Sequence, residues 1–167
     1  MEVKSPKQAT IHLENVSQNE TFAYSLILVR GLINVSSDSE SFLFVQPLRN
    51  QVELCEWKAR VRYGRFAIIL QLEEGENEFR FSIDNYKCCH TFVYRPATTE
   101  YVVMPMYIRC EGNDNYVDDN TVTSSMDVLN RITFGCRLIQ TMIAEMLHRS
   151  GFGRKTFSLE QSNRILK

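Results

Sequence analysis

Two hydrophobic patterns divide this chain, a period of two through its first two thirds and a helical period near its end. The alternation is clearest in the run EFRFSI, where Phe79, Phe81 and Ile83 are separated by polar residues. Such alternation is typical of a strand with one buried face. Further along, apolar residues recur every three or four positions, which places them on one side of a helix.

Short runs of strand-forming residues, bounded by turn residues, predict about seven strands at intervals of roughly ten residues, the spacing of an antiparallel sandwich. We expect Pro47 to end one run, because proline cannot donate to a ladder, and Pro105 to mark an edge or a bulge in another. The runs at 64–72 and 78–83 flank a short acidic loop and predict a hairpin. All the runs are 9–15, 22–33, 42–45, 57–62, 64–72, 78–83, 89–95 and 101–109.

The helical period predicts a single long helix near residues 125–149. Ser124 or Ser125 can cap its first turn, since a hydroxyl accepts from backbone N–H groups without a helical partner. Gly151 offers the left-handed residue that commonly ends a helix. The apolar stripe expected on one face is Leu129, Ile132, Cys136, Ile139, Met142, Ile143, Met146 and Leu147.

The predicted fold class is therefore mostly β, an antiparallel β-sandwich of about seven strands followed by one long C-terminal α-helix. The polar segment 1–8 is interpreted as a flexible arm, and 9–109 as the sandwich domain. Residues 110–123 are rich in Gly, Asn and Asp, which favours a loop between the domains. Residues 124–167 form the helical segment and tail.

Composition adds little that is specific. The 167 residues are 44% hydrophobic and 23% charged, as in ordinary globular proteins. The net charge of −1 gives no electrostatic reason to bind nucleic acid or an anionic membrane. We therefore expect neither as a partner.

The cysteines indicate a reducing compartment. They are odd in number and no pair has the spacing Cys-x-x-Cys, so reduced thiols are the simpler interpretation. The first ten residues lack the apolar run of a signal peptide. We expect a cytoplasmic or nuclear protein. The five cysteines are Cys55, Cys88, Cys89, Cys110 and Cys136.

No catalytic or metal-binding motif stands out. The three histidines, His12, His90 and His148, are not in an HExxH motif, in which both imidazoles would reach one zinc ion. Cys89 and His90 are neighbours on a predicted strand, so their side chains point to opposite faces. The Gly-Phe-Gly-Arg-Lys run at 151–155 follows a helix, whereas a phosphate loop precedes one. We predict no catalytic residue, no cofactor and no metal site in this chain.

The helix and its exit resemble a known family. The run FGCRLIQTMIAEMLHRSGFGRKTFSLEQ at 134–161 is similar to a stretch of the putative zinc metallopeptidase family of fungi and invertebrates, where a Q-x-x-x-A-E helix leads into G-F-G-R-[RK]-x-F-x-[FL]-E. The residues that fit are Gln140, Ala144, Glu145, Gly151, Phe152, Gly153, Arg154, Lys155, Phe157 and Glu160. The predicted hairpin also fits a family strand pair, through Gly64, Phe66, Leu70, Leu72, Gly75, Asn77, Phe79 and Phe81.

The resemblance covers roughly residues 60–160 and the tyrosine-rich 94–107 departs from it. It implies an N-terminal β-sandwich, with a metzincin-like catalytic domain whose HExxH lies much further along. No zinc ligand of the family falls on these residues. The chain is then either the front part of a longer zinc peptidase or a relative that kept this part for another use.

Three functions follow. The first is a non-catalytic protein-interaction or scaffolding domain, with a protein partner or self-association through the C-terminal helix, because the helix is apolar over more than one face. The second is the N-terminal portion of a zinc-dependent peptidase whose HExxH lies beyond this chain. The third is ligand binding by tyrosines on an open sheet face, by fold analogy alone. The residues expected to interact in the first are Phe134, Leu138, Met142, Met146, Arg154 and Lys155.

Overall fold

The computed structural model describes residues 10–34, 41–49, 52–53, 56–96, 102–108, 125–160 and 165–166. The chain divides into two compact units, Met1–Arg95 and Pro96–Lys167, and each is described by itself. The expected arm at 1–8 and the expected loop at 110–123 lie outside the described residues. The predicted mostly-β fold with one C-terminal helix is confirmed.

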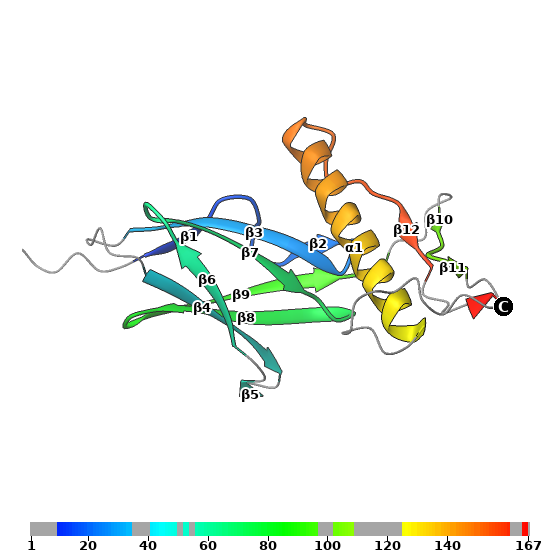
Figure 1. Ribbon diagram of the computed structural model, residues 1–167. Coiled ribbons are helices and arrows are strands. Elements are labelled where there is room, and N and C mark those ends of the chain that lie inside the picture. Colours follow the sequence, from blue (N-terminus) through cyan, green and yellow to red (C-terminus); the bar gives the residue numbers. More distant parts are fainter. Residues whose placement is uncertain are drawn as a thin grey trace, which may run out of the picture. The chain divides into compact units, whose positions relative to one another are not determined.

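The first unit consists of two sheets that lie one above the other (Figure 1). One sheet is antiparallel and has the order β1 (Ile11–Leu13), β3 (Leu26–Ile33), β7 (Arg65–Gln71). The other has the order β2 (Glu20–Phe22), β9 (Tyr86–Tyr94), β8 (Gly75–Ile83), β4 (Ser41–Arg49), β5 (Val52–Glu53), and β6 (Trp57–Val61) also pairs with β4. Within this sheet β2 runs parallel to β9, and the other pairs are antiparallel.

Alternation along the strands builds the core between the sheets. In β7 the residues Phe66, Ile68 and Leu70 are buried and those between them are exposed, as the period-two pattern predicts. The other sheet contributes Phe79 and Phe92, whose ring centroids lie 6.0 Å apart. Large rings that bury this way supply much of the apolar area of a small core.

The predicted hairpin between the two strands around the acidic loop is wrong. The structure pairs β7 with β3, and it pairs β8 with β4 and β9, so the connection crosses from one sheet to the other. Two neighbouring strands with equally apolar faces can share a sheet or face each other across a core, and local sequence does not distinguish these cases. A hairpin does join β8 to the next strand, β9, through Asp84, whose φ is 50°.

Two strand boundaries of the first unit differ from the prediction, one at a bend at residues 23–25 and one at Pro47. The expected strand at 22–33 is divided, since β2 ends at Phe22 and β3 begins at Leu26. The strand expected to end before Pro47 continues through it. Pro47 faces Phe79 of β8, but on the other side of β4 the register leaves a gap between the partners β6 and β5. A missing donor on that side costs the sheet nothing.

Asn77 holds the crossing between β7 and β8. Its side-chain oxygen accepts a hydrogen bond from the backbone N–H of Glu73 at 2.8 Å, and its amide donates to the carbonyls of Glu73 at 2.7 Å and Gly75 at 3.0 Å. Gly75 has a φ of 101°, which favours glycine. The acidic loop is thus a tight turn closed by one asparagine.

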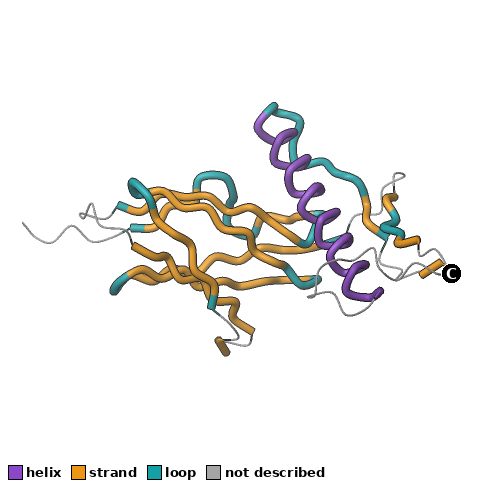
Figure 2. Tube along the Cα trace, in the orientation of Figure 1, coloured by secondary structure: helices purple, strands orange, loops and turns teal. Residues whose placement is uncertain are grey.

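The second unit contains the helix α1 (Ser125–Arg149), as predicted. Two short parallel pairs accompany it, β10 (Val102–Val103) with β12 (Ser158–Leu159) and β11 (Tyr107–Ile108) with β13 (Ile165–Leu166). Figure 2 shows α1 as a helix and the strands of each unit by secondary structure. The strand expected at 101–109 is therefore two short pieces on either side of residues 104–106, where Pro105 lacks a donor.

The end of α1 confirms the predicted glycine stop. Gly151 has a φ of 83°, its N–H donates to the carbonyl of His148 at 3.0 Å, and the N–H of Phe152 donates to that of Leu147 at 2.9 Å. This pair of bonds is the Schellman arrangement, which satisfies carbonyls that the helix leaves open. The candidate caps at the other end, Ser124 and the side chain of Ser125, lie outside the described residues.

Replacing Gly31 by Ala is expected to destabilise the first unit by about 1–3 kcal/mol. A Cβ at Gly31 would lie 2.4 Å from the carbonyl oxygen of His12 and 2.6 Å from the ring of Phe66, so neighbouring strands must move. Urea unfolding followed by tryptophan fluorescence measures the change. Gly135→Ala is the control, since nothing lies within 4 Å of a Cβ there. Equal stability of G31A and the parent would contradict the packing described.

Candidate functional site

The candidate site is a row of exposed apolar side chains on α1. Phe134 is 51% exposed, Ile139 51%, Met142 63% and Met146 65%. We call these four residues the exposed row. Their spacing of three to five residues keeps them on one side of the helix for more than three turns. Leu138, which was predicted with them, is half-buried.

The structure divides the apolar stripe that the sequence predicts on one face of α1 into a packed part and an exposed part. Leu129 is buried, and Ile132, Cys136, Ile143 and Leu147 are half-buried, as expected of a packed face. Ile139, Met142 and Met146 belong to the same predicted stripe but lie in the exposed row. The helix is therefore rotated from the orientation that hydrophobicity alone favours.

Two buried polar side chains explain the rotation. Gln140 and Glu145 are each only 4% exposed. The amide of Gln140 donates to the backbone carbonyl of Phe157 at 2.7 Å, and Glu145 accepts from the guanidinium Nε of Arg154 at 2.9 Å. These two bonds attach the segment after the helix to Gln140 and Glu145, so the part of the helix surface that carries these two side chains must be buried.

The Gln-x-x-x-Ala-Glu and Gly-Phe-Gly-Arg residues of the family resemblance therefore meet in this structure. Ala144 is fully buried between Gln140 and Glu145, where a larger side chain would separate helix and segment. Arg154 pairs with Glu145 and is 9% exposed at its side chain. Lys155 is exposed. The sequence placed Arg154 and Lys155 together, and the structure gives them different environments.

Gly135 directly follows Phe134, at the N-terminal end of the exposed row. A helical glycine is less stable than alanine by about 1 kcal/mol. Packing often explains such a residue, yet apart from its chain neighbours and the backbone of its own helix, nothing described lies within 4 Å of a Cβ built on Gly135. The described part of the chain thus offers no packing reason for it. Sequence reasoning overlooked this glycine, although its position four residues before Ile139 was a readable signal.

Several basic residues of α1 and of the segment after it are exposed. Arg131, His148, Arg149 and Lys155 are all exposed. The two carboxylates of the helix are placed differently, because Asp127 is half-buried in the first turn and Glu145 is buried in its ion pair.

The strand β9 holds a thiol and an imidazole on one face. Cys88 and His90 are two residues apart, so they share a side of the strand, whereas the pair weighed from the sequence, Cys89 and His90, does not. Burial, and secondarily the neighbouring Cys89, raises the pKa of Cys88 to about 11. Burial lowers the pKa of His90, whose ring stacks on Phe92 at 6.4 Å. Both groups are held neutral, which is unlike an activated thiolate and imidazolium pair.

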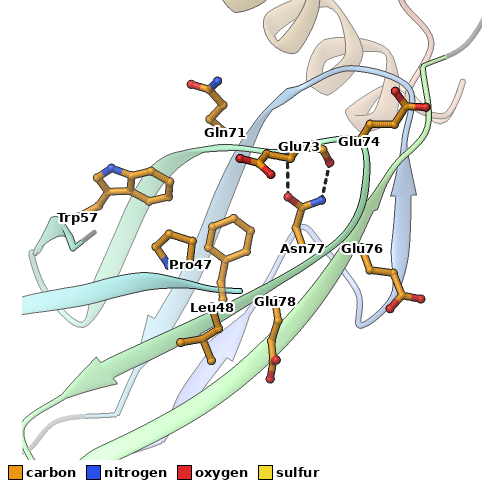
Figure 3. Close-up of a pocket in the computed structure, with 10 residues that line it drawn as sticks. Pro47, Leu48, Trp57, Gln71, Glu73, Glu74, Glu76, Asn77 and Glu78 are labelled. Carbon is orange, nitrogen blue, oxygen red and sulfur yellow. Dashed lines mark hydrogen bonds between the residues drawn. The ribbon is translucent and has the colours of Figure 1, made fainter. Parts of the chain in front are cut away.

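The first unit also contains a cavity of about 320 Å³. Trp57 and Pro47 line it together with acidic residues of the β7–β8 turn, and Trp57 packs against Phe79 with centroids 6.0 Å apart. Figure 3 shows Trp57 on the opposite side of the cavity from Glu74 and Glu76. Ring and carboxylates do not converge on one point, as a binding cage for a cation requires. Sequence reasoning missed this cavity, because its lining comes from separate strands.

Zinc is the metal that the family resemblance implies, and the described residues do not fit it. His12 lies on β1, His90 lies between aromatic rings on β9, and His148 is at the end of α1. Among the described residues, no group of three or more His, Cys, Asp or Glu side chains is placed to hold a metal ion. We derive no zinc chemistry from this part of the chain.

The remaining structural findings concern cysteines and membranes. Cys88, Cys89 and Cys136 are free thiols, and Cys55 and Cys110 lie outside the described residues. In the part of the chain that is described, no helix combines the length and apolar character needed to cross a bilayer.

Comparison with known proteins gives one family. Residues 10–165 match the family model described as Putative peptidase family, Metallopep. No curated protein matches the chain. Among solved structures, the chain is similar to an engineered protein with 8% identity and a TM-score of 0.38, covering 55% of this chain and 20% of that one. It is also similar to domain I10 from titin, with 17% identity, a TM-score of 0.33, and coverage of 52% and 99%. The chain thus covers only 20% of the length of the engineered protein.

Replacing Arg154 by Ala is expected to cost the second unit about 3–5 kcal/mol, since it leaves the buried carboxylate of Glu145 without its cation. Thermal unfolding followed by circular dichroism at 222 nm measures this, because α1 is the one helix of the described chain. Arg149→Ala removes an exposed arginine from the same helix and is the matched control. If both variants melt like the parent, the ion pair does not hold the segment.

At pH 8, Cys88 is expected to be alkylated far more slowly than its neighbour Cys89. A thiol with a pKa of about 11 is ionised in only about one molecule in a thousand at that pH. Iodoacetamide labelling with peptide mapping of C88S and C89S variants measures both rates. The rate at Cys88 should keep rising beyond pH 9.0, the ordinary pKa of the group. A plateau near pH 9 would show that burial does not protect this thiol.

Proposed function

The chain belongs to the Putative peptidase family, and from this premise we propose that it is a non-catalytic protein-interaction domain of a metallopeptidase-related protein. The single observation that supports the proposal is the exposed row on α1. Exposed apolar residues are common singly, but a contiguous set on one rigid helix is typical of an interaction surface. Methionine suits such surfaces, because its flexible thioether adapts to different shapes.

The free energy that the exposed row can contribute to binding determines how much more a partner must contact. Its four side chains are each about half exposed, so covering them gains on the order of 1 kcal/mol apiece. Association costs at least about 4 kcal/mol in lost translational and rotational freedom. The row by itself only offsets that cost. A partner must therefore also contact the residues around the row, including Gly135.

The family match supports a second candidate, the N-terminal portion of a zinc-dependent peptidase whose HExxH lies beyond this chain. In that case the rest of the enzyme covers the exposed row, and the sandwich helps to position substrate. The sequence of the native transcript distinguishes the candidates. A reading frame that continues past Lys167 into an HExxH supports the second one, and a stop codon at that point supports the first.

A photo-crosslinking amino acid at Met142 is expected to join the chain to one defined protein in the cells that produce it. Asn130 is exposed on the same helix outside the row, so the same group placed there should give no such adduct. The identified protein, once purified, should bind the parent at least tenfold more tightly than the Met146→Glu variant, because a carboxylate in the row must be desolvated on binding.

Asn130→Glu is the matched control for charge and should bind like the parent. The proposal fails if the adducts at the two positions are the same, or if Met146→Glu binds with unchanged affinity.

A further inference from the structure

We propose that the first unit binds a second copy of this chain head to tail, with the turn between β6 and β7 of one copy seated in the cavity of the next. We call Arg62, Tyr63, Gly64 and Arg65 the basic tip, and the cavity between Trp57 and the β7–β8 turn the acidic cavity. The inference goes beyond the proposed function, because it uses neither α1 nor the exposed row. Three observations support it: the exposed tyrosine, the opposite charges at the two ends of β7, and the lining of the cavity.

The basic tip is a tight, fixed turn that carries a tyrosine where asparagine is usual. Arg62 and Arg65 exchange two backbone hydrogen bonds of 2.9 Å. Tyr63 and Gly64 between them have φ values of 50° and 69°. Positive φ at both central residues is typical of a type I′ turn, which prefers Asn-Gly because a bulky side chain is strained there. The carbonyl of Gly64 also accepts from the backbone N–H of Ile33 at 2.7 Å, so β3 holds the turn in place.

The side chain of Tyr63 is not used by the fold. Its exposed fraction is 101%, so it packs against none of the described residues. Arg62 and Arg65 on either side of it are also exposed. Tyrosine and arginine are enriched among the residues that contribute most to binding at interfaces. A residue that strains its own turn and contacts nothing in its own chain is explained by a contact outside that chain.

The two ends of β7 carry opposite charge. Residues 57–71, which span β6, the basic tip and β7, contain four basic residues and no acidic one. Residues 73–78, at the other end of β7, contain four glutamates and no basic residue. The two turns lie at opposite ends of a strand of seven residues (Figure 1), which separates them by roughly 20 Å. The tip of one copy therefore cannot enter its own cavity, but it complements the cavity of another copy.

The acidic cavity matches the separation of ring and charge on the tip. Its volume of about 320 Å³ is at the small end of the range for ligand pockets, so it suits one large side chain. Trp57 and Glu74 lie on opposite sides of it (Figure 3). A bare cation cannot use both sides at once. The tip can place the ring of Tyr63 against the aromatic wall and a guanidinium at the exposed carboxylates of Glu74 and Glu76.

A contact of this kind does not close on itself. The tip and the cavity are different surfaces, so each copy in a pair still has one of them free, and further copies can add at either end. The contact is also small, which places the dissociation constant in the micromolar to millimolar range. The expected signature is therefore a weak association that passes beyond the dimer as the concentration rises.

Sedimentation velocity on the intact chain tests this signature. At low salt the weight-average mass should rise with protein concentration and exceed that of a dimer. In about 0.5 M sodium chloride it should fall toward that of the monomer, because exposed charges are screened. A mass that stays at the monomer value up to about 1 mM protein, the weak limit of such a contact, overturns the inference.

Two charge-reversed double variants identify the surfaces in contact. Arg62→Glu with Arg65→Glu makes the tip acidic, and Glu74→Lys with Glu76→Lys makes the cavity basic. Like charges then meet in each variant alone, so association should weaken by about tenfold or more. An equal mixture of the two variants should associate again, because every tip then finds a cavity of opposite charge. A mixture that associates no better than the separate variants overturns the head-to-tail contact.

Tyr63→Asn separates association from stability. The variant should melt at a higher temperature than the parent, since asparagine suits the turn better. It should nevertheless associate about tenfold or more weakly, because the cavity loses the ring that fills it. Ile69→Lys is the control, since Ile69 is 46% exposed on β7 away from both turns and should not affect association. Association lost in Ile69→Lys and kept in Tyr63→Asn points to pairing between β7 edges and overturns the inference.

Other occupants give distinct results. Association that is lost in Met142→Glu and kept in both charge-reversed variants overturns this inference and leaves the proposed function intact. Binding of the parent to vesicles of phosphatidylserine and phosphatidylcholine, lost when the tip is made acidic and without self-association, overturns it in favour of a membrane surface. If the mixed variants associate as expected and the crosslink at Met142 is absent, the inference stands and the proposed function fails.

Discussion

The orientation of α1 depends on two buried polar contacts. Gln140 donates to the carbonyl of Phe157 and Glu145 pairs with Arg154, so the segment after the helix is attached to one defined face. A buried carboxylate is costly unless it is paired, and a buried amide is costly unless it is hydrogen-bonded. The helix therefore cannot rotate to bury all of its apolar residues. The exposed row is a consequence of satisfying these polar groups.

The same contacts change the meaning of the family motif. A glutamate on a helix in a metallopeptidase-related chain invites a catalytic interpretation. In this structure the carboxylate of Glu145 holds Arg154, and the Gly-Phe-Gly turn brings that arginine back to the helix. The motif thus attaches the segment after the helix to α1, and the exposed row lies outside it. Structure and candidate function are linked through one ion pair.

In the first unit the corresponding constraint is the aromatic core between two sheets. Phe22, Phe79 and Phe92 pack with ring centroids about 6 Å apart, and all three are at most 1% exposed. The crossing from β7 to β8, closed by Asn77, places the two runs on either side of this core. The imidazole of His90 and the thiol of Cys88 lie on the edge of the same face, which is why burial shifts the pKa of each toward its neutral form.

The sequence by itself determined most of the local elements, namely the approximate positions of most strands of the first unit, the limits of α1 and the glycine that ends it, but it did not determine the division at residues 23–25 or the continuation of β4 through Pro47. These follow from periodicity and from the conformational freedom of single residues, which depend only on neighbours along the chain. Tertiary structure decided which strands share a sheet, so the β7–β8 hairpin could not be excluded in advance. It also decided which side of α1 is exposed. Met142 and Met146 are as apolar as Leu129, and only the distant contacts of Gln140 and Glu145 with residues 154–157 distinguish the open face from the packed one.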